Sequence, residues 1–304
     1  MGGFTRLAAT GGALGLGALL WGTLAERTHW TLRTVEVPIL PAGSAPVRVL
    51  HLSDLHMAPW QRSKQAWVRS LAALKPDLVV NTGDNLGHID GIAGIRAALE
   101  PFHGVPGVFV NGSNDYAAPI FKNPFKYFAG PSRRLREPTM LDTPALLTYF
   151  DELGWRDLNN TATALTAGGT RFRFVGVDDP HHEFDRLDEA SAALASLDSS
   201  TEGELIVGVA HAPYRRVLNA MVELGADLLF AGHTHGGQVC VPGYGALVTN
   251  CDIPRTQVKG LSRWRARGRE AHLHVSAGLG TSIYAPVRFA CPPEATLLTL
   301  VPRD

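Results

Sequence analysis

Side chains able to bind a divalent cation occur in a series of short polar motifs along this chain. In chain order the motifs are Asp54-Leu55-His56, Gly83-Asp84-Asn85, Gly112-Ser113-Asn114-Asp115, Ala210-His211-Ala212-Pro213, and Gly232-His233-Thr234-His235 followed by Gly236-Gly237-Gln238. Carboxylate, imidazole and amide groups of these kinds bind hard or borderline divalent cations. One such motif is weak evidence. Their order, their spacing and their position after apolar runs together indicate a metal site.

The spacing indicates two cations. Asp54 and His56 are two residues apart, and so are His233 and His235. Residues i and i+2 of an extended backbone point the same way, so each pair can bind one cation. The two carboxylate oxygens of Asp84 can bridge both cations. Two cations about 3.5–4 Å apart polarise a phosphoryl oxygen and ionise a bridging water at neutral pH. The pattern therefore predicts attack of a hydroxide on phosphorus.

The ligand types narrow the choice of metal. Imidazole and carboxylate ligands suit Mn, Fe or Zn, and we expect Mn because oxygen and nitrogen donors are mixed and no thiolate is among them. The cysteines Cys240, Cys251 and Cys291 are odd in number and lack metal-finger spacing. They indicate neither a disulfide framework nor a structural zinc site, and a single bridge between two of them stays open.

The elements that must position these motifs alternate between strand and helix. Apolar runs at 47–52, 78–80 and 108–110 predict buried strands, and each run ends just before a polar motif. Residues 61–74 and residues 89–99, which lie between these runs, each have the apolar spacing of a helix. Further strands are expected at 205–209 and 228–230, and a hairpin at 161–177 with Gly168-Gly169 as its turn. This order predicts an α/β fold with ligands gathered at the carboxyl ends of strands.

Length and composition limit the number of domains and the classes of partner. The chain has 304 residues, 45% hydrophobic and 18% charged, which is enough for one large α/β domain with a sizeable core. Lys+Arg and Asp+Glu number 28 each. This balance gives no support for nucleic-acid binding, and no protein partner is inferred.

The N-terminal segment differs in character from the remainder. Residues 7–25 carry no charge and are rich in Gly and Ala, and nineteen residues are about the minimum that spans a bilayer. An uncleaved membrane anchor is the leading interpretation; a cleavable signal peptide and a buried helix are the alternatives. We therefore predict an anchor or signal segment at 1–30, a linker at 31–46 and a catalytic domain at 47–304.

The motifs resemble those of the calcineurin-like metallophosphoesterases over roughly residues 47–300. Similarity is greatest to the membrane-associated bacterial branch, which includes enzymes similar to UDP-diacylglucosamine pyrophosphohydrolases. The runs that carry it are Gly232–Gln238, Gly278-Leu279-Gly280-Thr281 and Arg288-Phe289-Ala290-Cys291-Pro292-Pro293-Glu294. The resemblance implies a four-layer α/β/β/α sandwich with the metals at the carboxyl ends of the strands, and residues 7–25 add an N-terminal hydrophobic anchor segment.

The resemblance also implies a role for each ligand. One metal would be held by Asp54, His56 and His235, and the other by His211, His233 and an amide side chain. Asp84 would bridge the two. The full predicted set of metal ligands is Asp54, His56, Asp84, Asn114, His211, His233 and His235.

The third motif departs from the family pattern. That pattern is Gly-Asn-His-Asp or Gly-Asn-His-Glu, in which Asn binds metal and His assists the leaving group. Here strict register places Ser113 at the ligand position and Asn114 at that of the His. A slip of one residue would return the amide of Asn114 to the metal, and we predict this slip. The usual imidazole is absent either way.

Candidates for the remaining roles follow from this departure. Asn114 and Asp115 are the predicted catalytic residues, and Arg288 and His182 the predicted substrate-binding residues. His181 and His182 are candidates to replace the missing imidazole, with a solvated loop as the alternative. A salt bridge is the alternative for Arg288.

The sequence thus predicts a membrane-tethered bimetallic hydrolase of phosphoester or pyrophosphate bonds. The expected substrate is a phosphorylated small molecule or lipid, with a lipid-linked or nucleotide-linked substrate favoured, and the expected location is the cell membrane on an undetermined side. A phosphodiesterase acting on soluble nucleotides is one alternative. A metal-binding scaffold weakened by loss of the His is the other.

Overall fold

The first of two large sheets is built around buried strands near the start of the catalytic region. The computed structural model describes residues 12, 15–119, 139–198 and 204–303. Six strands lie in the order β1-β14-β2-β3-β4-β5, where β2 to β5 are parallel, β14 is antiparallel to β2, and β1 is parallel to β14. Their bounds are β1 (Thr31–Leu40), β2 (Val47–Leu52), β3 (Leu78–Asn81), β4 (Gly107–Phe109), β5 (Trp155–Asp157) and β14 (Glu294–Pro302).

The second sheet also has six strands, in the order β12-β13-β9-β8-β7-β6. Strands β13, β9, β8 and β7 are parallel, and an antiparallel hairpin closes each edge. The predicted hairpin at 161–177 is confirmed as the β6–β7 pair. The bounds are β6 (Thr161–Ala167), β7 (Thr170–Gly176), β8 (Leu205–Val209), β9 (Leu228–Ala231), β12 (Gly260–Ala266) and β13 (Arg269–Val275), with a separate pair β10 (Cys240–Val241) and β11 (Gly245–Ala246).

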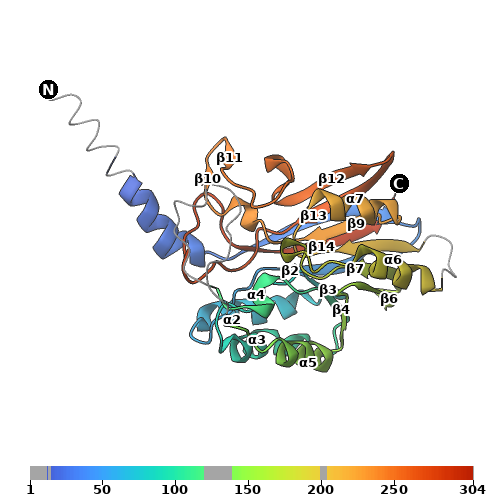
Figure 1. Ribbon diagram of the computed structural model, residues 1–304, viewed down its shortest axis with the longest axis horizontal. Coiled ribbons are helices and arrows are strands. Elements are labelled where there is room, and N and C mark those ends of the chain that lie inside the picture. The colour runs from blue at the N-terminus through green and yellow to red at the C-terminus, as the bar shows by residue number, and fades with distance from the viewer. Residues whose placement is uncertain (1–11, 13–14, 120–138, 199–203, 304) are drawn as a thin grey trace.

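Helices cover the outer faces of the two sheets (Figure 1). On the first sheet these are α2 (Arg62–Ser70), α3 (Gly91–Leu99) and α5 (Thr143–Leu153), and on the second α6 (Leu187–Ser196) and α7 (Arg215–Glu223). Shorter elements are α4 (Ser113–Tyr116), η1 (Trp21–Ala25), η2 (Glu26–Thr28), η3 (Leu71–Leu74), η4 (Glu100–Phe102), η6 (Pro180–His182), η7 (His235–Gly237) and η8 (Arg255–Gln257).

Three apolar cores separate the resulting layers. One core lies between the first sheet and its helices and one between the second sheet and its helices. The third lies between the two sheets, where Val49 and Val80 of the first sheet meet Val207 and Phe230 of the second. The alternating strand–helix pattern thus folds into the predicted α/β/β/α sandwich, a mixed α/β architecture.

The segment predicted as a linker needs correction. Residues 31–40 form β1, which pairs with β14 along its length. The segment 31–46 contains Pro38, Pro41 and Pro46, of which only Pro38 lies in β1. Pro38 is exposed on an edge strand, where a missing N–H removes no ladder bond from the sheet. The fold therefore begins before Val47.

The predicted anchor at 7–25 lies partly outside the described residues. Residues 15–20 are helical and continue into η1. In the part of the chain that the structure describes, no helix is both long enough and apolar enough to cross a bilayer.

Candidate metal centre

Four of the predicted ligands meet at the carboxyl ends of the strands. One ligand atom from each of Asp54, His56, Asp84 and His235 lies within 4.8 Å of the others. The Nε2 atoms of His56 and His235 are 3.2 Å apart, Nε2 of His56 is 3.5 Å from Oδ2 of Asp84, and Nε2 of His235 is 3.5 Å from Oδ1 of Asp54. Carboxylate and imidazole groups at this spacing surround a volume suited to one cation.

Two further imidazoles lie on the other side of Asp84. Nε2 of His211 is 3.5 Å from Oδ1 of Asp84, and Nδ1 of His233 is 3.3 Å from the same His211 nitrogen. The two oxygens of Asp84 thus face two separate imidazole groups, Oδ2 toward His56 and Oδ1 toward His211. This is the arrangement that a carboxylate bridging two cations requires.

The backbone at these residues is strained. Asp54, His56, Asp84, His233 and His235 all have positive φ, between 39° and 67°. Non-glycine residues rarely adopt this conformation, which persists only where surrounding structure enforces it and which is concentrated at functional sites. The strain turns the side chains that end β2, β3 and β9 toward a common point.

The electrostatics of this cluster fit divalent cations. Burial raises the pKa of Asp54 and of Asp84, and burial lowers the pKa of His56, His233 and His235. Buried carboxylates without a matching cation are costly, and Nδ1 of His56 is buried without a hydrogen-bond partner. A positive charge held between neutral imidazoles and ionised carboxylates offsets the cost of burying those carboxylates.

His211 behaves differently from the other imidazoles. Burial opposes its protonation, but Asp84, Asp54 and Asp179 together raise its pKa to about 9. Its Nδ1 lies 2.7 Å from the carbonyl oxygen of Thr82. A hydrogen bond of this kind fixes the orientation of a ligating imidazole, which leaves Nε2 facing Asp84.

A chain of buried hydrogen bonds supports Asp54 from the core between the sheets. Ser53 donates to Oδ2 of Asp54 at 2.5 Å and accepts from Thr82 at 2.7 Å. Thr82 in turn lies 3.0 Å from Nε2 of His51, whose Nδ1 is 2.8 Å from Nδ1 of His274. The chain joins β2 to β13 and holds the carboxylate in a single orientation.

Neighbouring side chains of the third motif point in two different directions. Asn114 points at Asp84, with its backbone N–H 2.7 Å from Oδ1 and its amide nitrogen 2.7 Å from Oδ2. Ser113 turns away and donates to Asp179 at 2.7 Å. The amide of Asn114 is thus the group beside Asp84; that it binds a metal, as the predicted slip requires, stays a prediction.

Asp115 lies behind this motif. It is fully buried, and its carboxylate accepts from the backbone N–H groups of Asn85 at 2.7 Å and Gly112 at 3.0 Å. Burial and the charge of Asp84 raise its pKa to about 7. These contacts correct the predicted catalytic role, because they use Asp115 to hold the second and third motifs together.

Two histidines approach the cluster from η6. The ring centroid of His181 lies 4.5 Å from that of His233, and Nδ1 of His182 lies 2.7 Å from Oδ2 of Asp179. Burial opposes ionisation of Asp179, but hydrogen bonds from His182 and Ser113 hold its pKa well below its usual range. A carboxylate–imidazole pair beside the metal cluster is suited to proton transfer.

Arg288 is not placed to bind substrate. Its side chain is 0% exposed, and its guanidinium donates to the carbonyl oxygens of Gly278 at 3.1 Å and Gly280 at 2.6 Å. It also lies 3.2 Å from Nδ1 of His235. The predicted substrate-binding role is corrected to a structural one, because backbone carbonyls already surround the group.

Sequence analysis missed Lys64. Its ammonium group is buried and donates to the carbonyl oxygens of Leu55 and His56. Burial, with the nearby charge of Arg288, lowers its pKa to about 7. The available signal was its position four residues before Val68, because i and i+4 share the buried face of α2.

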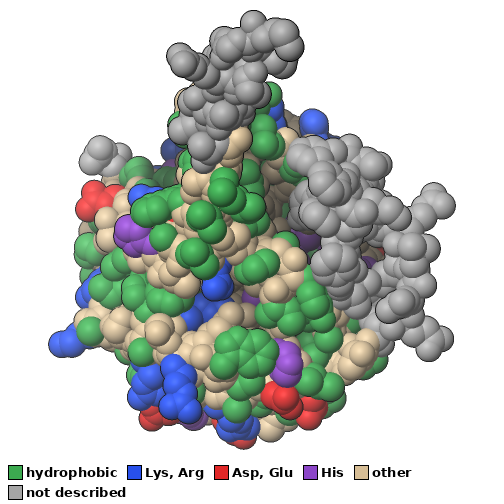
Figure 2. Space-filling model, turned by 90° about the vertical axis from the view of Figure 1, so that its left-hand side faces the viewer, with side chains coloured by type: hydrophobic (Ala, Val, Ile, Leu, Met, Phe, Trp, Pro, Cys, Tyr) green, Lys and Arg blue, Asp and Glu red, His purple; other side chains and the backbone are tan. Residues whose placement is uncertain are grey.

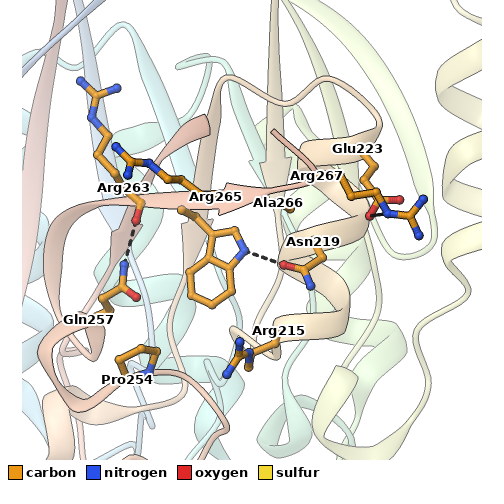
Figure 3. A pocket seen from close by; sticks show the side chains of 10 residues that line it. Arg215, Asn219, Glu223, Pro254, Gln257, Arg263, Arg265, Ala266 and Arg267 are labelled. Carbon is orange, nitrogen blue, oxygen red and sulfur yellow. Dashed lines mark hydrogen bonds and ion pairs between the residues drawn. The ribbon is translucent and has the colours of Figure 1, made fainter. Parts of the chain in front are cut away.

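A large cavity lies elsewhere, between α7 and β12 (Figure 3). Its volume is about 740 Å³, and none of the predicted metal ligands lines it. The indole of Trp264 lies across it and donates to Asn219 at 2.9 Å, while Arg267 pairs with Glu223 at 2.8 Å. Its lining also includes Arg215, Pro254, Gln257, Arg263, Arg265 and Ala266.

The chain is similar to several known proteins. Residues 47–237 match the model of the calcineurin-like phosphoesterase family. Phosphodiesterase YaeI of Escherichia coli is 31% identical over 85% of this chain and 84% of its own length. An uncharacterized metallophosphoesterase of Aquifex aeolicus is 25% identical over 93% and 97% of the two chains. Among solved structures, a dimetal phosphatase from Danio rerio aligns with a TM-score of 0.42 and 14% identity, over 80% of this chain and 88% of that chain.

The family match spans more than half of the chain, so the chain belongs to the calcineurin-like phosphoesterase family. It is a metal-dependent phosphoesterase, a hydrolase. Asp54, His56 and Asp84 are buried and form, with the partly exposed His235, a group able to hold a divalent cation.

Proposed function

We propose that this hydrolase cleaves phosphoester or pyrophosphate bonds with two divalent cations, Mn favoured. Asp54, His56 and His235 would hold the first cation, and His211, His233 and the amide of Asn114 the second. The observation that supports this assignment best is Asp84, whose two oxygens face separate imidazole groups. When bound, two such cations supply a nucleophile at neutral pH and neutralise charge on the phosphoryl oxygens.

The chain supplies proton transfer from a neighbouring loop. The family's usual imidazole is absent from the third motif. His182 pairs with Asp179 and lies against His181, whose ring packs on His233. We infer that His182 donates a proton to the departing oxygen, because the contact of its Nδ1 with Oδ2 of Asp179 at 2.7 Å orients the ring. Ser113 holds Asp179 in place through its hydroxyl.

A lipid-linked or nucleotide-linked substrate, reached from a membrane surface, is the favoured class. Hydrophobic side chains are spread over the side from which the N-terminal helix projects (Figure 2). On that helix and η1 the exposed apolar residues are Leu16, Leu19, Leu20, Trp21 and Leu24. Exposed apolar residues on an amphipathic or spanning helix favour attachment to a membrane.

Hydrolysis of a soluble nucleotide phosphodiester is the second candidate, favoured by the similarity to a protein named phosphodiesterase. A screen of Mn-loaded protein against a bis-aryl phosphate, nucleotide diesters and a lipid-linked pyrophosphate separates the two. We expect turnover of the aryl diester and highest kcat/KM on the lipid-linked substrate. Turnover confined to nucleotide diesters selects the second candidate, and Mn binding without any turnover selects the scaffold.

A vesicle experiment tests the membrane proposal separately. We expect the full-length protein to sediment with anionic phospholipid vesicles and the variant L19S/L20S/L24S to stay in the supernatant. The matched control is Leu247→Ser, which removes an exposed leucine outside the N-terminal helix. Equal sedimentation of all three proteins would contradict the tether.

A further inference from the structure

The N-terminal segment is joined to a loop of the metal centre more than 260 residues later. The carbonyl oxygen of Gly22 accepts from the backbone N–H of Arg288 at 3.0 Å. The approach is so close that a Cβ on Gly22 would lie 2.5 Å from the carbonyl oxygen of Arg288. The segment is therefore packed on this loop by its backbone and does not merely pass over it.

Glu26 fixes the same loop by its side chain. Its carboxylate is buried and accepts from the backbone N–H groups of Cys291 at 2.6 Å and Ala290 at 3.1 Å. This burial limits competition from water for the carboxylate oxygens. The indole N–H of Trp21 also donates to Oε2, at 2.8 Å. Three donors thus converge on one carboxylate, and bonds to an ionised acceptor are stronger than neutral ones.

The loop carries this restraint to the candidate ligands through Arg288. Its guanidinium binds the carbonyl oxygens of Gly278 and Gly280, as described above. Those residues lie against Asp54: the N–H of Gly280 donates to the carbonyl oxygen of Asp54 at 2.7 Å. A Cβ on Gly278, whose φ is +72°, would lie 2.6 Å from Cβ of Asp54. The segment 278–280 thus forms a backbone wall behind a strained ligand.

We propose that Glu26 is a positioning residue of the metal centre, which it acts on through the 288–291 loop and Arg288. The inference rests on the metal-dependent function proposed above and extends the site to the N-terminal segment. Its physical basis is strain: the positive φ of Asp54 and His235 persists only while neighbouring backbone holds it. Loosening the loop that carries Arg288 removes part of that support.

Glu26→Gln in the full-length protein tests the proposal. The change keeps size and shape but replaces one acceptor oxygen with an NH₂ group that faces backbone or indole donors. Amide hydrogen exchange on metal-free protein and Mn titration by calorimetry are the two measurements. We expect about tenfold faster exchange at 290–291 and at 279–280, and about tenfold weaker Mn binding. Glu36→Gln, an exposed carboxylate on β1, is the matched control and should change neither.

Three results would contradict the positioning role of Glu26 or the function on which it rests. Faster exchange confined to 290–291, with Mn affinity within twofold of wild type, would show a local clamp and overturn the proposal. If Glu26→Gln does not fold, Trp21→Phe removes one donor to the carboxylate and should give the same pattern at roughly threefold amplitude; no change in that variant also overturns it. Absence of Mn binding in wild type would refute the proposed function instead, and the exchange measurement would still report the coupling.

Discussion

The metal centre and the cavity between α7 and β12 differ in how their charged side chains are buried and paired. At the metal centre Asp54 and Asp84 are buried, their pKa values are raised by burial, and the backbone is strained. Around the cavity Arg265 and Arg267 are 81% exposed, and Glu270 and Glu223 pair with them. The cavity therefore has compensated, solvated charge, while the metal centre gathers buried charge. Chemistry is expected where desolvated charge converges.

The largest expected effect comes from removing a buried charge at the metal centre. Asp84→Asn keeps the shape but removes the charge that faces both imidazole groups. Loss of groups that merely orient ligands costs about 10–100-fold, so we expect more than about a hundredfold loss of aryl-diester turnover, with at least one metal equivalent lost by elemental analysis. Glu223→Gln at the cavity is the control and should stay within twofold of wild type. Two bound metals and full turnover in D84N would contradict the bridging assignment.

The second largest expected effect concerns the proton donor of the metal centre, and it should depend on the leaving group of the substrate. Removing the proton donor with His182→Gln should slow hydrolysis of alkyl esters by about a hundredfold, within the usual range for general acid catalysis. Nitrophenyl esters should change little, because their leaving groups depart as anions. The comparison is the dependence of log kcat on leaving-group pKa. An equal loss on both substrate types would mean that His182 only shapes the pocket.

A pH effect is expected beside the cavity. His272 pairs with Arg263 across β12 and β13, and burial, with that charge, lowers its pKa to about 4. The folded state keeps the ring neutral while the unfolded state protonates it near its ordinary pKa. This contribution to stability is present above about pH 6.5 and is lost as the pH falls toward 4. Urea unfolding of metal-free protein between pH 7 and 5 should show a shallower pH slope in His272→Gln, by up to about 1.4 kcal/mol per pH unit. Parallel slopes would refute it.

The smallest effect isolates the cavity itself. Trp264→Phe removes the N–H that donates to Asn219 but keeps an aromatic ring. We expect about 1 kcal/mol lower unfolding free energy, as for one hydrogen bond, and unchanged kcat/KM. Thermal unfolding and the aryl-diester assay measure the two quantities. A loss of turnover at full stability would show that the cavity takes part in function.

Local patterns in the sequence were sufficient for the interior strands and the ligand set. The buried runs before Asp54 and Asp84 read clearly because both faces of β2 and β3 are covered. Strand β1 was missed because Pro38 suggests a connection, and its compatibility with an edge position appears only from the pairing of β1 with β14. Arg288 was misassigned for a related reason: its type suggests phosphate, but its burial depends on carbonyl groups from distant segments.

Long-range contacts also explain what the motifs did not show at the site. The pairing of Asp179 with His182 is local in sequence. The orientation of the Asp179 carboxylate, however, depends on a hydrogen bond from Ser113, 66 residues earlier. Lys64 supports His56 from within an amphipathic helix, where a lysine usually marks the solvated face. Spacing alone identifies ligands; the groups that orient them come from elsewhere in the fold.

The parallel pairing of β1 with β14 has a consequence for how the chain folds. The partners of β1 are residues 294–302, and Glu26 bonds to residues 264 and 265 positions later. Contacts of such long sequence separation form late and slow folding, because the intervening loop must close first. During synthesis from the N-terminus, β1 and the apolar helix before it therefore emerge from the ribosome long before their partner strand exists. They stay unpaired, and prone to association with chaperones or with a lipid surface, until β14 has been made.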